Sequence, residues 1–444
     1  MSPILDQPTS TRLLASMQAN NLVLLCGAGL SVPAPSNLMS AVRVARTCYD
    51  KYAPTEVLPV PLRDDPDALA AHFYTSGQFT SVFIGNLVPW NDLTGSPNAG
   101  HAAVSDFLIT RAAHGALSAN FDTLIENWAA ENKVLMRGAL DGHEAIAFAQ
   151  STSPLLKFHG CLVRAQPQTL WTQQQLQDPL IQQRIDSCSA WMNLNLPGKD
   201  LLVVGFWSDW GYLNQILANA LTGPAAGSVT VVDPLDQAEL QVKAPVLWGT
   251  LTGLSAQFQH VQASGNDVLE ELRIGFSKVW LRKFFQLGKP LIEAQGASCS
   301  SDALEPGAEL GCDDLYNLRR DAEGVPYHRA AQKKEPAPDA AQAAYTHLLL
   351  LGANASRKGS WYEHGGRTIR VVQGAGQGLS VVQERYSEAP ALEQADIVVC
   401  AGSIDLGVPG KVVASGEGSS MVRPARGGEA RWLTLEQARA ELQL

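Results

Sequence analysis

The 444-residue sequence lacks any Cys-x-x-Cys pair, and its seven cysteines are scattered along the chain. An odd number of isolated cysteines gives neither a disulfide framework nor the ligand spacing of a tetrahedral zinc site. We therefore expect free thiols, no bound zinc and a reducing, cytoplasmic location.

Long apolar runs and a surplus of positive charge are also missing. No stretch approaches the length of a membrane span, and residues 1–20 lack a basic start followed by a long apolar core. The formal net charge of −10 argues against sequence-independent binding of nucleic acid, which depends on clustered Lys and Arg. The sequence predicts a soluble protein with no export signal, no membrane segment and no direct nucleic-acid partner.

What the sequence does contain is a glycine-rich turn behind a short apolar run. Residues 21–26 fit a buried parallel strand, Gly27 and Gly29 leave the main chain open to a ligand, and a helix is expected over 36–52. Free N–H groups and a helix N-terminus favour bound anions, so this segment predicts a pyrophosphate cradle. A plain strand-to-helix turn would give the same pattern, because the full dinucleotide fingerprint is absent.

Apolar runs alternate with helical patterns over most of the chain. After a helix within 1–20, strands are expected at 115–118, 155–158, 201–205, 228–232 and 246–248, and helices at 101–111, 123–131, 170–195, 212–221 and 267–285. Residues 53–100 indicate an inserted helical subdomain, one of whose helices Asp67 would cap. The alternation predicts an α/β protein with a Rossmann-like, doubly wound parallel sheet, in which ligands lie beyond the carboxyl ends of the strands.

The composition changes after residue 285. Residues 286–343 are rich in Ala, Gly, Pro and charge and are interpreted as an exposed linker or as a loosely structured connection with one helix. Strand patterns return at 347–351, 368–372, 396–400 and 411–414, and Thr434 with Gln437 predicts the start of a terminal helix. The sequence thus predicts an N-terminal domain over 1–285 and a smaller C-terminal α/β domain over 344–444. A second glycine-rich turn at 373–378 would suit a bound nucleotide, an oligomer or partner surface, or a simple bend.

Four segments, taken in order, resemble the NAD-binding core of the sirtuin superfamily. They are Gly27-Ala28-Gly29-Leu30-Ser31, Ser118-Ala119-Asn120-Phe121-Asp122-Thr123-Leu124-Ile125-Glu126, Lys157-Phe158-His159-Gly160 and Gly205-Phe206-Trp207-Ser208-Asp209. The resemblance covers about residues 10–285. It implies a site that binds NAD and cleaves the bond between nicotinamide and ribose.

Within that resemblance each polar position has an expected role. Asn120 would orient the ribose or an attacking water, Asp122 would bind the nicotinamide amide, and His159, with an unperturbed pKa near neutrality, would be the general base. The residues expected to bind the phosphates and the adenosine ribose are Gly27, Ala28, Gly29, Ser31, Gly205, Ser208 and Asp233.

Each of these positions also has an ordinary structural alternative. Asn120 and Asp122 could be turn and cap residues, and His159 could be a hydrogen-bonded histidine beside a bend. Ser208 and Asp209 could cap the helix after Gly205, and Asp233-Pro234 is a common turn pair.

The departures from protein-deacylating sirtuins narrow the expected activity. Those enzymes carry two cysteine pairs for structural zinc after the His-Gly motif, where this chain has only Cys161 and Cys188. Ala119 replaces their Gln before the Asn, and Val32-Pro33-Ala34-Pro35 replaces their Asp-Phe-Arg element. The pattern looks more like the zinc-free bacterial sirtuin-like domains that hydrolyse NAD in anti-phage defence.

That second resemblance implies an NAD glycohydrolase, or NADase, which releases nicotinamide and ADP-ribose. An NAD-dependent protein deacylase and a non-catalytic nucleotide sensor or scaffold are the alternatives. Because an NAD-consuming domain must be held inactive until it is triggered, we expect control by a homo-oligomer or by a partner protein. An ATPase translocase and an Argonaute-like protein are the kinds of partner that the resemblance implies.

Overall fold

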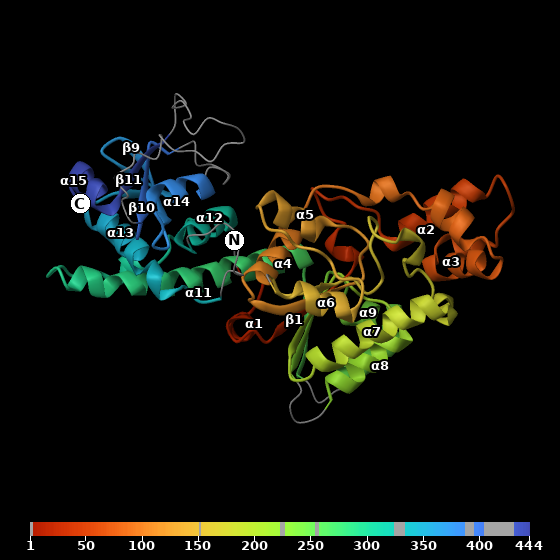
Figure 1. Cartoon of the computed structure of the whole chain (residues 1–444). Helices are drawn as coiled ribbons and strands as arrows, with labels where there is room; N and C mark the ends of the chain where they lie inside the picture. The colour runs from red at the N-terminus through yellow and green to blue at the C-terminus, as the bar shows by residue number, and fades with distance from the viewer. Residues whose placement is uncertain are drawn as a thin grey trace, which may run out of the picture. The chain divides into compact units, whose positions relative to one another are not determined.

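The computed structural model describes residues 3–150, 152–222, 227–253, 257–323, 334–386, 395–403 and 430–444. The chain divides into two compact units, Met1–Glu131 with Leu135–Leu272, and Asn132–Val134 with Arg273–Leu444. In Figure 1 the first unit runs from red to green and the second from green to blue. The division falls inside α11 (Gly265–Glu293), whereas the predicted N-terminal domain ended at residue 285 of that helix.

The first unit is built on a six-stranded parallel sheet in the order β3-β2-β1-β4-β5-β6. Its strands are β1 (Leu22–Cys26), β2 (Ala113–Ser118), β3 (Leu155–Leu156), β4 (Asp200–Val204), β5 (Ser228–Asp233) and β6 (Gln257–Gln262). This order is that of the doubly wound dinucleotide-binding sheet. The predicted fold class is confirmed.

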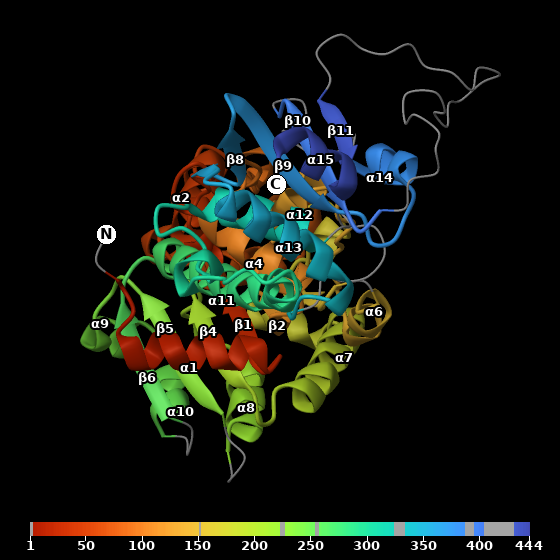
Figure 2. The same cartoon turned by 90° about the vertical axis from the view of Figure 1, so that its left-hand side faces the viewer.

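Helices cover both faces of this sheet because its central strands are apolar on both sides. Val229 and Val231 pack in one core cluster with residues of α7, α8 and α10, whereas the alternate residue Thr230 accepts a 2.8 Å hydrogen bond from Arg12 of α1. Figure 2 shows α1 running in front of β4 to β6. The helices of this unit outside the insertion are α1 (Gln7–Gln18), α4 (Ala99–Ile109), α5 (Leu124–Glu131), α6 (Gly142–Phe148), α7 (Pro179–Asn195), α8 (Gly211–Ala220), α9 (Gln237–Lys243) and α10 (Pro245–Thr252).

The predicted helical insertion lies between β1 and β2. The predicted range 53–100 contains α3 (Pro66–Thr75) and the 3-10 or π turns η2 (Val60–Arg63), η3 (Phe79–Leu87) and η4 (Trp90–Leu93). α2 (Ala41–Tyr52), which lies in the helix expected over 36–52, packs in the same core cluster. The predicted cap is wrong: Asp65 accepts the N–H of Ala68 at 2.9 Å and caps α3, while Asp67 accepts the N–H of Gln173 at 3.0 Å. Pro66 takes the first helical position, which moves the cap to the residue before it.

One predicted strand of the first unit is wrong and one strand was not predicted. Residues 246–248 belong to α10, which begins at Pro245 and whose Leu247 N–H donates to Asp209 at 2.7 Å. The sixth strand is instead β6, which escaped prediction because half of its residues are Gln and it is only partly buried. A run of three apolar residues occurs in strands and in helical turns alike, so the run alone does not identify a strand.

The second unit holds a smaller five-stranded sheet in the order β11-β10-β9-β8-β7. Its strands are β7 (Ser356–Lys358), β8 (Trp361–His364), β9 (Arg367–Gln373), β10 (Ile397–Ala401) and β11 (Arg431–Thr434), of which β9, β10 and β11 run parallel. Its helices are α12 (Cys312–Glu323), α13 (Ala341–Gly352), α14 (Leu379–Tyr386) and α15 (Leu435–Leu442), with the C-terminal part of α11. The predicted smaller C-terminal α/β fold is confirmed.

Individual predictions in this unit fared unequally. The strands at 368–372 and 396–400 are β9 and β10, and Thr434 with Gln437 forms the predicted capping box of α15. The strand expected at 347–351 is wrong, because its leucines lie in α13 and pack into the core of the unit. The segment interpreted as a linker contains α12 and the short turns η7 (Ser301–Leu304) and η8 (Pro338–Ala340). The strand expected at 411–414 lies outside the described residues.

The second glycine-rich turn follows β9 and bends back against the end of β10. Gly374 N–H donates to the carbonyl of Ala401 at 2.6 Å, and Gly376 N–H donates to that of Gly402 at 3.0 Å. Gly376 has φ +69°, a value that glycine adopts without strain. These bonds establish the bend itself.

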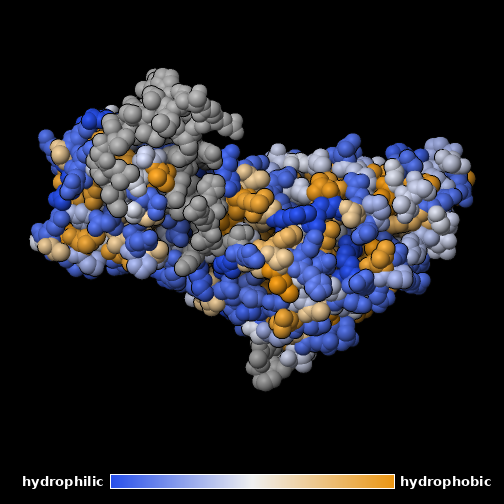
Figure 3. All heavy atoms as spheres, in the orientation of Figure 1, coloured by the Kyte–Doolittle hydropathy of each residue, from blue (hydrophilic) through white to orange (hydrophobic). Residues whose placement is uncertain are grey.

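The molecular surface mixes hydrophilic and hydrophobic residues on the face shown in Figure 3. Large exposed apolar side chains such as Val57, Leu135 and Val242 come from separate segments of the chain. Within the described ranges, no helix is both long and apolar enough to cross a membrane.

Candidate functional site

The topology brings all the predicted site residues of the first unit to one edge of the sheet. In a parallel sheet every strand ends at the same edge. Across that edge in spatial order, β3 leads to His159, β2 to Asn120 and Asp122, β1 to Gly27–Ser31, β4 to Gly205 and Ser208, and β5 ends at Asp233.

The glycine turn after β1 packs directly on the turn after β4. Gly27 N–H donates to Val204 O at 3.1 Å, and Gly29 N–H donates to Gly205 O at 2.9 Å. A Cβ atom at Gly27 would lie 2.5 Å from Gly205 O, and one at Gly205, whose φ is +64°, would lie 2.5 Å from Leu30 N. The glycines are therefore required for two backbones to approach each other closely.

The turn continues into a single 3-10 turn and not into a long helix. η1 (Ala28–Leu30) ends at Ser31, and the helix expected over 36–52 begins only at Ala41 with Ser40 as its cap. The macrodipole of α2 therefore does not act at Gly27–Ser31, because its effect is confined to the first turn of a helix. Within the turn, the N–H groups of Leu30 and Ser31 donate to Gly27 O and Ala28 O at 2.9 and 3.0 Å.

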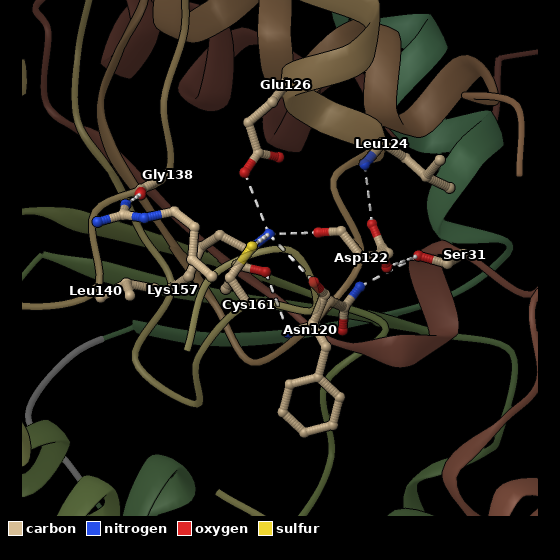
Figure 4. A network of polar contacts seen from close by, with 12 residues as sticks. Ser31, Asn120, Asp122, Leu124, Glu126, Gly138, Leu140, Lys157 and Cys161 are labelled. Atoms are coloured by element: carbon tan, nitrogen blue, oxygen red, sulfur yellow. Dashed lines mark hydrogen bonds and ion pairs between the residues drawn. The ribbon is translucent and has the colours of Figure 1, made fainter. Parts of the chain in front are cut away.

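A buried hydroxyl, that of Ser31, joins the turn after β1 to the turn after β2. Ser31 Oγ donates to Asp122 Oδ2 at 2.8 Å and accepts from Asn120 Nδ2 at 3.2 Å, as Figure 4 shows. His101 Nε2 lies 3.0 Å from the same oxygen. The structure thus brings Ser31, Asn120 and Asp122 together as predicted from the sheet.

His101 is a part of this cluster that sequence reasoning missed. Its Nδ1 accepts the N–H of Asn98 at 3.2 Å, so Nε2 carries the proton and donates to Ser31. Burial lowers the pKa of His101 to about 4, although Asp122 opposes the shift, and the ring is neutral at pH 7. The available signal was the Asn98-x-x-His101 capping box at the start of α4; the helix expected from residue 101 did not include the cap.

Asn120 is fixed in orientation yet leaves one atom unused. Its Nδ2 donates to Gly27 O at 3.0 Å as well as to Ser31, and both contacts require the amide nitrogen on that side. Its Oδ1 is buried and has no hydrogen-bond partner in the described part of the chain. A buried acceptor without a donor is unfavourable and uncommon, so this oxygen is available to a donor of a ligand or of a water.

Asp122 combines the cap role with the contact to Ser31. Its Oδ1 accepts the N–H of Leu124 at 3.1 Å at the start of α5, which is the structural alternative considered for this residue. Its Oδ2 is occupied by the hydroxyl of Ser31. One carboxylate therefore links the start of a helix to the glycine turn.

His159 lies on the neighbouring turn in a buried, largely aromatic setting. Its Nε2 is 3.2 Å from Tyr212 Oη, and its ring centroid is 4.5 Å from that of Trp210. Burial, assisted by the positive charge of Arg184, lowers its pKa to about 3. The expectation of a pKa near neutrality is therefore wrong, since it used the value of an exposed imidazole.

The turns of Asn120 and His159 are adjacent. Both residues stand three positions beyond the paired residues Leu117 and Leu156 of β2 and β3. Leu162 N–H donates to Phe121 O at 2.8 Å and joins the two turns directly.

Ser208 and Asp233 do not belong to the hydrogen-bonded cluster around Ser31. Ser208 is exposed, and its neighbour Asp209 accepts the N–H groups of Val246 and Leu247 in the first turn of α10. Asp209 also accepts the side-chain amide of Asn214 in α8, at 3.4 Å. Asp233 Oδ1 accepts the N–H of Leu235 at 2.9 Å, the turn geometry that its Asp-Pro sequence suggested. Their proposed contacts with a nucleotide remain predictions.

The described residues form no cluster suited to a metal ion. Among them, no group of three or more His, Cys, Asp or Glu side chains is placed to hold one. All seven cysteines are free thiols, and five of them are buried.

The chain resembles known proteins only weakly. No family model matches the chain, and no curated protein matches it. Among solved structures it is similar to two mutants of a Sir2 homologue in complex with ADP-ribose. One has a TM-score of 0.34 and 13% identity over 62% of this chain and 98% of that one, and the other has 0.33 and 13% over 60% and 95%. At these values the likeness carries no conclusion about this chain.

Proposed function

We propose that the protein is an NAD hydrolase that cleaves the nicotinamide–ribose bond and releases nicotinamide and ADP-ribose. The observation that carries the proposal is the fixed amide of Asn120, whose buried Oδ1 has no partner among the described residues. The four sirtuin-like segments support it, because they follow β1, β2, β3 and β4 at one edge of a dinucleotide-type sheet.

The proposed reaction breaks the C1′–N bond, whose electron pair returns to the nicotinamide ring, while a water oxygen attacks C1′ and loses a proton. Asn120 Oδ1 accepts a hydrogen bond from that water or from a ribose hydroxyl. The pyrophosphate lies against the Gly27–Ser31 turn, and Asp122 bonds the nicotinamide amide. Ser208 and Asp233 approach the adenosine end from β4 and β5.

His159 takes the proton in this proposal. Its pKa of about 3 means that the imidazole is neutral at pH 7, so one ring nitrogen carries a lone pair. A base with so low a pKa is weak until its surroundings change. The developing positive charge on the imidazole would need an anionic neighbour, and the substrate diphosphate brings negative charge to this edge.

The test is turnover of NAD by the purified full chain, with nicotinamide and ADP-ribose quantified. Asn120→Ala and His159→Ala are each expected to lower the rate at least about 100-fold, the usual effect of removing a positioned acid–base group. Asn219→Ala and His143→Ala, which alter exposed residues of the same types, should keep the wild-type rate. Full turnover in both site variants, with unchanged circular dichroism, would refute the assignment.

Measurements of NAD consumption and of NAD binding distinguish the alternative functions. A protein deacylase would consume NAD only with an acyl-lysine peptide and would yield acyl-ADP-ribose. A sensor or scaffold would bind NAD in calorimetry and leave it intact.

A role in anti-phage defence is part of the proposal, with the second unit controlling the first through assembly or a partner. Cells expressing the wild-type chain should lose NAD and resist phage, whereas cells expressing Asn120→Ala should do neither. Equal plaque numbers on the two strains would count against that role.

A further inference from the structure

We propose that Lys157 is a positioning residue that fixes the Asn120–Asp122 turn against the turn of His159. The inference rests on the proposed hydrolysis of NAD at these turns. Lys157 precedes His159 by two residues.

The main chain of Lys157 begins the turn that carries His159. Its N–H donates to Ala139 O at 2.7 Å, and its carbonyl accepts from Gly160 N–H at 2.9 Å. The backbone of Lys157 is therefore fixed on both sides, and its side chain starts from a defined point.

The side chain of Lys157 crosses to the neighbouring turn. Its Nζ donates to the carbonyl of Asp122 and lies 3.4 Å from that of Phe121. It also pairs with Glu126 Oε1 at 3.1 Å and contacts Cys161 Sγ at 3.4 Å. Figure 4 shows these contacts meeting at the Lys157 nitrogen. One ammonium thus connects β3, the turn after β2, and α5.

The positive charge of the buried Lys157 ammonium strengthens its bonds to the neighbouring turn and to Glu126. The Lys157 side chain is only 1% exposed and that of Glu126 is 13% exposed. Burial alone would lower the pKa of Lys157, but Glu126, Cys161 and Asp122 together outweigh it and the pKa is raised. Lys157 therefore stays protonated, and bonds from a buried ammonium to its acceptors are stronger than bonds between neutral groups.

The Asn120–Asp122 turn is consequently held from two sides. The side chains of Asn120 and Asp122 bond Ser31, whereas the carbonyls of Phe121 and Asp122 face Lys157. Removing Lys157 leaves the Ser31 side intact and frees the carbonyl side. The turn can then shift relative to His159 while the glycine turn that would bind phosphate is untouched.

The first test is Lys157→Met, which keeps the length of the side chain and removes its charge. We expect kcat for NAD to fall on the order of 100-fold, as a displacement of about 1 Å can do. KM should stay within about threefold, because no phosphate contact is altered. Arg63→Met removes two 2.8 Å bonds to Asp50 on the exposed insertion and should leave both constants unchanged.

A second variant moves Lys157 without changing any charge. A Cβ at Gly138 would lie 2.4 Å from Lys157 Cδ and 2.7 Å from Glu126 Oε1, so Gly138→Ala must displace this pair. If the position of Lys157 matters, Gly138→Ala lowers kcat with KM preserved, even though Lys157 and Glu126 are both retained. This variant also serves if Lys157→Met does not fold.

Hydrogen exchange tests the inference even if the wild-type chain leaves NAD intact. Amides 119–124 should exchange faster in Lys157→Met and Gly138→Ala than in the wild type and Arg63→Met. Unchanged exchange of amides 119–124 in both variants would overturn the positioning role. If the wild type turns over NAD, a wild-type kcat in both variants would overturn it as well. Absence of turnover in the wild type would instead reject the proposed function alone.

Discussion

The hydroxyl of Ser31 lies within hydrogen-bond distance of three other side chains. It receives protons from His101 Nε2 and Asn120 Nδ2 and gives its own to Asp122 Oδ2. These assignments follow from the Asn98 N–H on His101 Nδ1 and from the Gly27 carbonyl on Asn120 Nδ2. The backbone groups of Asn98 and Gly27 thereby determine the tautomer of His101 and the amide orientation of Asn120, and the Ser31 hydroxyl donates its own proton to Asp122.

Removing that oxygen should disturb the site and the fold together. Ser31→Ala leaves Asp122, Asn120 and His101 each short of a partner inside the protein. We expect the free energy of unfolding to fall by about 1–3 kcal/mol, the usual effect of a buried polar group left unsatisfied. Urea titration measures it, with exposed Ser208→Ala as the control; equal midpoints for the wild type and Ser31→Ala would contradict the network.

Acid should destabilise the protein through its buried histidines. The folded pKa of His101 is about 4, below the unfolded value of about 6.5, so the unfolded state binds more protons between these limits. The stabilisation is complete above about pH 6.5 and is lost as the pH falls towards 4, with a slope of up to about 1.4 kcal/mol per pH unit. His159 and His347, with pKa values lowered to about 3, act in the same direction.

His101→Gln should therefore reduce the pH dependence of unfolding. Urea midpoints at pH 7, 6 and 5 should fall less steeply in this variant than in the wild type, since one proton no longer binds on unfolding. His143→Gln, which removes an exposed imidazole, should keep the wild-type slope. Parallel slopes for the wild type and His101→Gln would show that His101 is not the group that titrates.

At the scale of elements, the contact between the turns after β1 and β4 is the tightest constraint on sequence. Gly27→Ala would place a Cβ 2.5 Å from Gly205 O and from Phe206 Cα, and neither backbone atom can move alone. We expect a loss of stability of about 1–3 kcal/mol, as for overpacking. Gly249→Ala in α10 meets nothing within 4 Å and should be neutral or stabilising. Thermal unfolding of Gly27→Ala and Gly249→Ala tests this expectation. Similar melting temperatures for the two variants would contradict it.

The strands that the sequence predicts correctly are those whose burial leaves a continuous apolar run. β1 and β4 are buried almost throughout, and their runs end at glycine turns. Residues 246–248 and 347–351 have equally apolar runs but form helices, because Pro245 begins α10 and because the leucines of α13 continue a longer helical segment. Local composition does not contain the tertiary contacts that decide such cases.

The sequence predicted the residues of the candidate site whose positions follow from the order and direction of the strands. Ser31, Asn120 and Asp122 meet because β1 and β2 pair in parallel and end at one edge. The sequence predicted no role for His101 or Lys157, because those roles depend on how α4 packs and on how far one long side chain reaches. The pKa of His159 could not be foreseen either, because it follows from the aromatic residues that bury the ring.

The whole molecule consists of two units that share α11 along the chain. The C-terminal half of this helix supplies Trp280 and Phe284 to the core of the second unit. Phe284→Ala should lower the stability of that unit by about 3–5 kcal/mol through the cavity it leaves. Hydrogen exchange should rise in α13, β9 and β10 and stay unchanged in β1 and β4. A rise in both sheets alike would indicate that the chain unfolds as one cooperative body.

The position of β1 in the middle of its sheet has a consequence for synthesis. Its two neighbours, β2 and β4, come much later in the chain, and Arg12 of α1 bonds Thr230 and Gln259 of strands that come later still. During translation, almost half of the polypeptide must therefore be synthesised before β1 can pair with both of its neighbouring strands. The turn proposed to bind phosphate cannot pack against the turn after β4 until Gly205 has been synthesised, so a nascent chain that stops short of that residue lacks the proposed phosphate site.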